Sequence, residues 1–318
     1  MLKHPEYWVL LFLFILISCT QEIELKTTHI QREPVLSGLI SPGRNSIINL
    51  GTTSSVLDDD STTLEWTDFE LWKGNDLVFS EPDKTLQKIT VPGQLLRENC
   101  RYTLVIRLPD GKEVKATDSI PALVRIDRAE GFKGKTYDSY GAPHYDYSIT
   151  FTDPPDERNY YELVFISQRW WNSKVEVSYL NAVEIADPAI QAEGLVDYNP
   201  VSFVFSDNLF NGREYTLNMK MFNEGTYHAW LSEPMVSWGN GDFFILRSVS
   251  RTYYDFRKSW LLHKRTQNQG AFNEDPLATL LIGNPTSVIS NVTNGYGILA
   301  AYVQDFIKVE VKQWKQPL

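Results

Sequence analysis

The sequence predicts a mainly β protein, built from tandem β-sandwich-like domains of immunoglobulin-like or transthyretin-like type, with one amphipathic helix near the C-terminus. Apolar and polar residues alternate along most of the chain, which is the two-residue period of half-buried strands. Of the 318 residues, 42% are hydrophobic and 22% charged, as in globular proteins. We expect one β-sandwich domain over residues 33–121 and a second β-rich domain over residues 122–318.

Residues 1–18 are typical of a lipoprotein signal peptide. Tyr7 to Ile17 is an unbroken apolar run of 11 residues, which suits a signal-peptide core and is too short to span a membrane. Leu16-Ile17-Ser18-Cys19 follows the pattern of a bacterial lipobox, so we predict that Cys19 carries the lipid. The alternative is an ordinary signal peptide in which the cysteine stands by coincidence.

Residues 19–32 are expected to form an acidic tether behind the lipid. Thr20 stands where an inner-membrane retention signal has Asp, so no such signal is evident. Gln21-Glu22-Ile23-Glu24 is similar to the surface-export signals of Bacteroidota lipoproteins, and a solvated tether explains it equally well. These features predict a lipid-anchored protein of the outer membrane, at the cell surface or on the periplasmic face.

Strand patterns define the first domain. They occupy residues 34–40, 46–50, 68–73 and 77–79, followed by a hairpin over residues 101–118 that turns at Pro109-Asp110-Gly111. Proline presets φ for this turn, and glycine permits a positive φ. Cys100 stands at the start of the hairpin, and with Cys19 acylated it has no partner for a disulfide. We interpret it as a packed, inert thiol rather than a nucleophile.

The loop before the third strand contains a weak candidate metal site. Asp58-Asp59-Asp60 resembles the start of a calcium loop, in which carboxylates at alternate positions such as Asp58 and Asp60 hold the ion. Thr63 and Phe69 stand where such a loop requires Gly and Glu. A solvated loop is therefore favoured, and no metal site is assigned.

The second domain continues in strands and holds the candidate ligand-binding residues. Alternating patterns run through residues 145–151, 161–165, 215–221 and 307–311. Trp170 and Trp171 end one of these strands, where neighbouring side chains point to opposite faces. An exposed tryptophan at a loop edge can stack on a sugar or anchor a partner, whereas burial of both is the alternative.

One segment, residues 248–268, has a helical period. Val249, Tyr253, Phe256 and Trp260 recur at spacings of four, three and four, which predicts an amphipathic helix with its aromatic stripe in the core. Its basic residues are Arg251, Arg257, Lys258, Lys264 and Arg265. We interpret them as a solvated face, with docking to a partner as the alternative.

Charge and motifs exclude several functions. The net charge of −10 argues against a nucleic-acid partner. The chain lacks the metalloprotease, hydrolase and P-loop motifs, and its five histidines are scattered without ligand spacing. Residues 295–300 match a dinucleotide fingerprint, but too few residues follow for a βαβ unit, so we predict a turn between strands. We expect no cofactor and no enzymatic activity.

The sequence resembles the Bacteroidota outer-membrane lipoproteins called domain of unknown function 4249. The likeness lies in the lipobox and in segments along nearly all of the chain: residues 36–40, 102–104, 120–121, 151–154, 159–161, 207–215, 248–259, 284–285 and 290–298. The long loop over residues 51–66 departs from the family's pattern.

This resemblance implies an accessory role beside a TonB-dependent outer-membrane receptor and assigns no catalytic residues. We therefore expect a binding or accessory component that is held to the membrane by the lipid on Cys19. Two alternatives are a surface hydrolase of glycans or peptides, with carboxylates brought together by the fold, and a structural or adhesive surface module.

Overall fold

The computed structural model describes residues 32–54, 63–137, 143–155, 157–171, 174–184, 187–194, 202–231, 235, 239–267 and 286–312. The predicted signal peptide, the lipid site Cys19, and Asp58 and Asp60 of the candidate calcium loop lie outside these residues. Among the described helices, none has the length and apolar character that crossing a membrane requires.

Short strands fill the first part of the chain, where alternating residues are buried. These strands are β1 (Pro34–Ile40), β2 (Ser46–Thr52), β3 (Asp68–Lys73), β4 (Asp76–Ser80), β5 (Lys88–Val91), β6 (Cys100–Arg107) and β7 (Glu113–Ile120), with the short 3-10 helix η1 (Gly93–Leu95) after β5. In β1 the residues from Leu36 to Ile40 alternate between buried and exposed, as the period-two pattern predicts.

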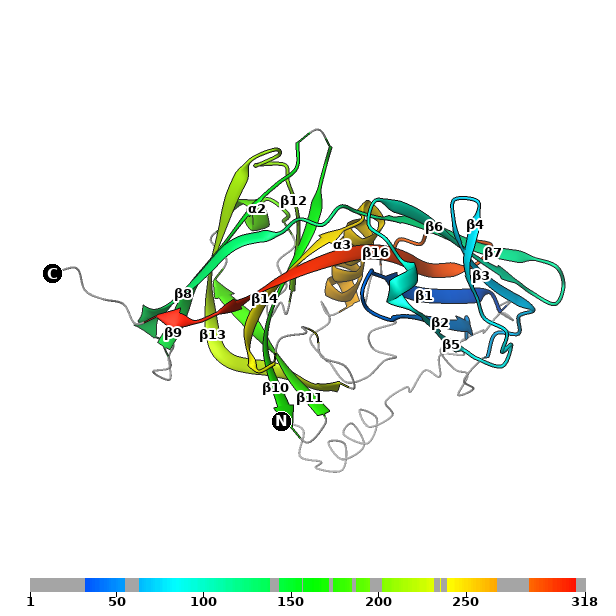
Figure 1. The fold of residues 1–318 in the computed structure, drawn as a ribbon, viewed down its shortest axis with the longest axis horizontal. Coiled ribbons are helices and arrows are strands. Elements are labelled where there is room, and N and C mark those ends of the chain that lie inside the picture. Colours follow the sequence, from blue (N-terminus) through cyan, green and yellow to red (C-terminus); the bar gives the residue numbers. More distant parts are fainter. Residues whose placement is uncertain are drawn as a thin grey trace, which may run out of the picture. The chain divides into compact units, whose positions relative to one another are not determined.

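Longer strands follow, together with two α-helices. They are β8 (Ile126–Tyr137), β9 (Pro143–Thr152), β10 (Tyr160–Trp171), β11 (Lys174–Glu184), β12 (Ser202–Ser206), β13 (Glu214–Leu231), β14 (Gly241–Val249), β15 (Val292–Thr293), β16 (Tyr296–Val309) and β17 (Val311–Lys312); the helices are α2 (Pro188–Gln191) and α3 (Arg251–Gln267). The fold-class prediction is confirmed, because the described chain is mainly β with one long helix near its C-terminus (Figure 1).

The first strands form a two-layer sandwich. One layer is the end of a 12-stranded sheet, in the order β16-β1-β2-β5, and the other is a five-stranded sheet in the order β15-β7-β6-β3-β4. Large apolar side chains from both layers, such as Leu36 and Ile48 against Phe69 and Leu104, make one buried core. Cys100 is a free cysteine that is partly buried and packs against this core, which agrees with the packed thiol predicted from the sequence.

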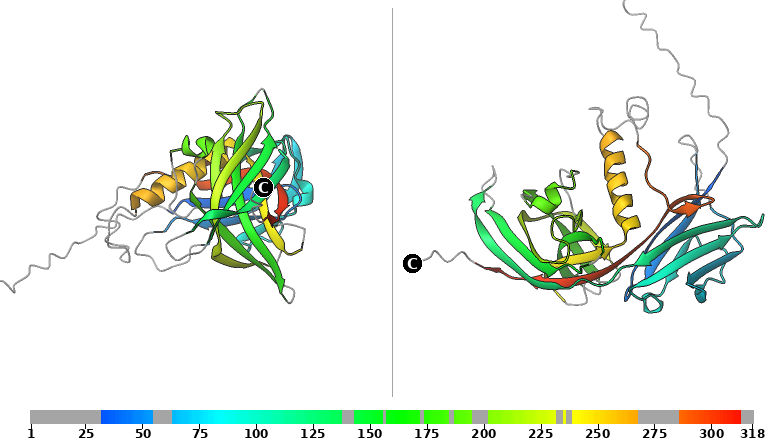
Figure 2. Two further views of the ribbon diagram at one scale, coloured as in Figure 1. Left: turned by 90° about the vertical axis from the view of Figure 1, so that its left-hand side faces the viewer. Right: turned by 90° about the horizontal axis from the view of Figure 1, so that it is seen from above.

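The rest of the 12-stranded sheet curls back on itself. Its order is β17-β8-β9-β13-β11-β10-β14-β16, with β12 paired to β10. Because β17 follows β16 directly and pairs with β8 at Gly131 and Phe132, the first and last strands of this part of the sheet are brought together. The odd-numbered residues Tyr161, Leu163 and Phe165 of β10 point into the enclosed aromatic core. Figure 2 shows this curvature and shows α3 rising where the curved sheet and the sandwich join.

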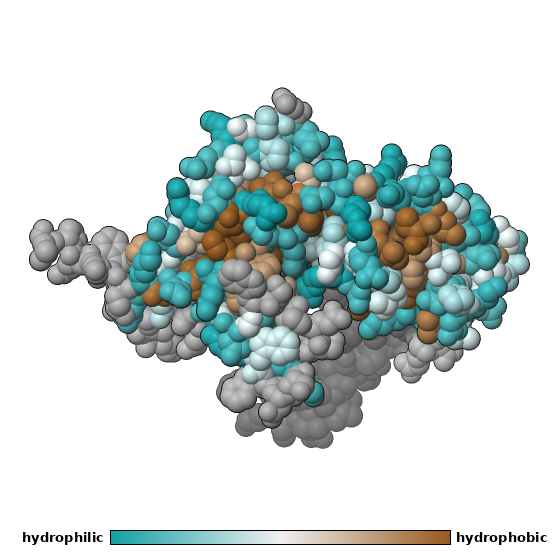
Figure 3. Space-filling model, viewed as in Figure 1, coloured by the Kyte–Doolittle hydropathy of each residue, from teal (hydrophilic) through white to brown (hydrophobic). Residues whose placement is uncertain are grey.

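Strand β16 belongs to both halves. It runs parallel to β1 from Tyr296 to Ala301 and antiparallel to β14 from Tyr302 to Val309. Accordingly, Leu299 lies in the sandwich core and Val309 in the core of the curved sheet. Apolar side chains gather in two areas of the face in Figure 3, one over each group of strands. The prediction of two domains did not foresee that the first core includes a C-terminal strand.

The turn predicted over residues 295–300 is shorter than expected, because Tyr296 to Ala300 are already the first residues of β16. It joins β15 to β16, and Asn294 has a φ of 60°. Gly297 has a φ of 113°, and a Cβ there would lie 1.8 Å from the carbonyl oxygen of Leu36. Only glycine lets β16 approach β1 this closely.

The helix α3 begins later than predicted. Ser248 and Val249 were placed in the helix, but they are the last residues of β14 and pair with Val303 and Tyr302 of β16. The first residues of the helical pattern therefore belong to the sheet, and the helix runs from Arg251 to Gln267.

Candidate functional site

Three carboxylates hold α3 against the sheets, and the most deeply buried is that of Glu162. Its Oε2 accepts hydrogen bonds from Arg247 Nη1 and from the Tyr253 hydroxyl, each at 2.6 Å. Its Oε1 lies 3.4 Å from Arg257 Nη2 and accepts a hydrogen bond of 2.8 Å from the Ser202 hydroxyl. Burial alone would raise the pKa of Glu162, but the two guanidinium groups hold it below its ordinary value.

Glu193 makes the second attachment, to the next residues of the helix. Lys258 Nζ lies 2.7 Å from its Oε2 and donates to its backbone carbonyl at 2.6 Å, and the Tyr254 hydroxyl donates to Oε2. The backbone N–H and the hydroxyl of Ser206 donate to Oε1. Burial opposes ionisation of Glu193, yet these donors lower its pKa.

Asp118 makes the third attachment, at the start of the helix. It accepts hydrogen bonds from the hydroxyls of Ser250 and Thr252. Ser250 Oγ also accepts the backbone N–H of Tyr253 at 3.0 Å, which is the capping bond of a helix N-terminus. Burial raises the pKa of Asp118.

These contacts correct the interpretation of the basic face of α3. Arg257 and Lys258 are not solvated but pair with the buried Glu162 and Glu193. Arg251 is exposed and pairs with Asp255 one turn later. Of the aromatic stripe, Tyr253 is buried, whereas Trp260 is 45% exposed.

A cleft of about 520 Å³ opens beside the start of α3. It is lined by residues 99–101, 118–122, 157–160 and 248–251. Three exposed arginines, Arg101, Arg158 and Arg251, line it together with the exposed Glu157. The carboxylate of Asp118 is already occupied by Ser250 and Thr252. The net charge of the chain is −10, so these arginines make the cleft a positive area on an acidic protein. The cleft therefore favours an anionic ligand or acidic side chains of a partner.

Another buried acidic pair, Asp153 and Asp207, lies at one end of the curved sheet. Asp153 accepts hydrogen bonds from the Tyr161 hydroxyl and, at 2.8 Å, from the Gly212 N–H. Asp207 accepts the N–H of Asn159 at 2.7 Å. Burial raises the pKa of Asp153, and the charge of Asp207 adds to the effect. Protein donors thus occupy both carboxylates, which fasten loops to the core.

The predicted ligand residues lie away from the cleft. Trp170 is 44% exposed at the end of β10, where its backbone N–H donates to Asn240 Oδ1 at 2.8 Å. The side chain of Trp171 lies outside those that the structure describes. Trp170 lines neither the cleft nor the hollow treated below, and its ligand role stays a prediction. In the described chain, no group of three or more His, Cys, Asp or Glu side chains is placed to hold a metal ion.

The comparison with known protein families shows to which family the chain belongs. The family model described as Domain of unknown function (DUF4249) matches residues 20–306. The chain belongs to the DUF4249 family. The match confirms the family to which the sequence was found similar, and the family's description names no activity. None of the curated proteins compared with the chain matches it significantly.

The segments that carry the likeness to DUF4249 make the contacts described above. Residues 248–259 supply the helix cap and the partners of Glu162 and Glu193. Asn291, in another such segment, accepts the Leu299 N–H at 3.0 Å and donates to the carbonyls of Leu299 and Thr117. In this chain, these two segments thus join the helix and the sheets.

Proposed function

We propose that this DUF4249 protein is an outer-membrane lipoprotein that serves as a binding or accessory component beside a TonB-dependent transporter. The observation that carries the proposal is the Leu16-Ile17-Ser18-Cys19 lipobox behind an apolar run of 11 residues. Several acyl chains on one cysteine give lasting attachment, since each buried CH₂ contributes about 0.8 kcal/mol. The lipid places the body at the membrane, where a transporter lies within reach.

Two features of the body support binding over catalysis. The arginine-lined cleft offers a positive docking place for an acidic segment of the transporter. The buried carboxylates accept hydrogen bonds from protein donors, which gives them a structural use; these residues are Asp118, Asp153, Glu162, Asp187 and Asp207.

The anchor is tested by replacing its cysteine. We expect Cys19→Ala to abolish acyl labelling and membrane retention, because no other residue takes the lipid. Cys100→Ala is the matched control and leaves both unchanged, since this thiol packs against the sandwich core. Labelling that persists in Cys19→Ala overturns the lipoprotein assignment.

The partner is tested by purification of the tagged, full-length protein from outer membranes. We expect a TonB-dependent receptor to co-purify, and the triple variant Arg101→Ala/Arg158→Ala/Arg251→Ala to lose it. Arg128→Ala is the control, because this exposed arginine pairs with Glu214 and does not line the cleft.

Other outcomes favour the alternatives. Absence of any receptor at any stoichiometry contradicts the accessory role. Hydrolysis of glycans or peptides by the purified protein would establish the enzyme, and intact nutrient uptake with lost attachment in a deletion strain would establish the adhesive module.

A further inference from the structure

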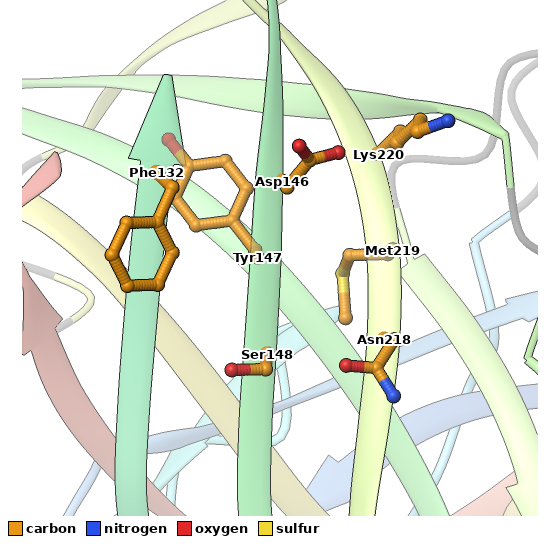
Figure 4. A pocket seen from close by; sticks show the side chains of 7 residues that line it. All are labelled: Phe132, Asp146, Tyr147, Ser148, Asn218, Met219 and Lys220. Atoms are coloured by element: carbon orange, nitrogen blue, oxygen red, sulfur yellow. The ribbon is translucent and has the colours of Figure 1, made fainter. Parts of the chain in front are cut away.

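A second hollow, of about 330 Å³, lies on strands β8, β9 and β13 (Figure 4). The strand register explains which side chains meet there. Phe132 of β8 and Lys220 of β13 both pair with Asp146 of β9, so these three residues form one row across the strands. Ser148 pairs with Asn218 in a second row, two residues further along β9.

The lining side chains of these two rows face solvent rather than the core. Tyr147 and Met219 lie between the rows and are buried in the core of the curved sheet. Because side chains alternate along a strand, Asp146 and Ser148 on either side of Tyr147 point to the opposite face. Asn218 and Lys220 flank Met219 in the same way. A ligand therefore reaches the hollow without any opening of the sheet.

The hollow combines an aromatic ring with polar groups that the protein leaves available. Phe132 is half-buried and offers its ring. Lys312 Nζ lies 5.8 Å from the ring centroid, on a side chain that is 60% exposed and pairs with the exposed Glu130 at 3.6 Å. Among the described residues, neither the Asp146 carboxylate nor the Ser148 hydroxyl has a hydrogen-bonding partner, although both are half-buried. Such groups are satisfied by water or by a ligand.

We propose that this hollow binds a neutral saccharide. The apolar C–H face of a sugar ring packs on Phe132, as apolar ligand groups do on aromatic side chains. The sugar hydroxyls, each both donor and acceptor, match the acceptor Asp146 and the amphoteric Ser148 and Asn218. The volume lies at the lower end of the range for small-molecule pockets, which suits one or two sugar units.

The proposal goes beyond the accessory role and does not rest on it, because its test uses the purified protein without a membrane or transporter. The detergent-solubilised, full-length protein is titrated with maltose, cellobiose and lactose, and binding is followed by saturation-transfer NMR. We expect at least one disaccharide to bind saturably. Phe132→Ala weakens this binding about tenfold through loss of the ring, and Asp146→Asn weakens it to a similar extent.

Two further variants separate recognition from folding. Phe132→Tyr keeps the ring and retains binding, which shows that any loss in Phe132→Ala is loss of the platform. Trp260→Ala removes another exposed aromatic residue, on α3, and leaves the affinity unchanged. The proposal is overturned if no disaccharide binds saturably, or if binding survives Phe132→Ala and disappears in Trp170→Ala.

Discussion

The buried charge of Glu162 shows how a single residue can hold this protein together. Glu162 is almost wholly buried, and two arginines share its charge. Arg247 also lies over the ring of Tyr302, at 4.9 Å from the centroid. Burying a charge is costly unless it is paired and hydrogen-bonded, so each member of this group depends on the others.

We expect Glu162→Gln to lower the free energy of unfolding by about 3 kcal/mol, because the guanidinium groups of Arg247 and Arg257, only 15% and 28% exposed, lose their counter-charge. Urea unfolding followed by tryptophan fluorescence measures the change. Glu214→Gln is the control, since its pair with Arg128 is about 60% exposed on both sides, and we expect little effect. An equal effect of the two substitutions would contradict the structural role of Glu162.

At the scale of elements, ionic contacts attach α3 to the rest of the protein as much as apolar contacts do. Its residues reach Glu162 on β10, Glu193 after α2 and Asp118 on β7. The helix thus connects three parts of the chain that lie far apart in sequence. Its attachment consequently depends on the ionisation of these carboxylates.

Acid is expected to release α3. The pKa values of Glu162 and Glu193 are lower in the folded than in the unfolded protein, where Glu titrates near pH 4.3. Their contribution to stability is therefore complete above about pH 4.3 and is lost as the pH falls through the lower folded pKa. Asp118, with a raised pKa, favours the folded state at low pH and opposes the two glutamates.

Hydrogen exchange of α3 as a function of pH measures this release. We expect protection to fall below about pH 4 in the unmodified protein. Glu193→Gln is expected to be less stable at pH 7 and to show a weaker dependence on acid. Protection of α3 that stays constant down to pH 2 would contradict the prediction.

The sequence predicts where strands lie along the chain better than it predicts which strands pair with one another. Residues 34–40 and 68–73 agree with β1 and β3 residue for residue, because alternation is a local property. The pairing of β1 with β16 was not predictable, since a two-residue period specifies a buried face and not which strand lies alongside.

The same limit applies to the sites. Arg257 and Lys258 were interpreted as solvated because the residues with which they pair, Glu162 and Glu193, lie far upstream in the sequence. The cleft arginines come from three separate segments, and Phe132 meets Asp146 only through strand register. Trp170 was recognisable as a large residue at a strand end, but sequence alone does not place it near any hollow.

At the scale of the whole molecule, β16 ties the sandwich to the curved sheet. It supplies Leu299 and Ala301 to one core and Val309 to the other. Its loss would leave β1 paired only with β2 and β14 paired only with β10. Neither core is complete without it.

We therefore expect a chain that ends at Gly295 to lose cooperative unfolding in both halves. A chain that ends at Lys312 retains every described strand and is the control. Thermal unfolding by circular dichroism, with limited proteolysis, measures the outcome. A protease-resistant fragment over residues 33–121 in the shorter chain would show that the sandwich folds without β16.

The late place of β16 in the sequence also has a consequence for the chain during its synthesis. The ribosome makes the chain from its N-terminus, so β1 is complete long before the strand that covers its edge. An uncovered strand edge invites pairing with other chains. The edge of β1 therefore stays open to other chains until β16, almost the last of the described strands, has been made.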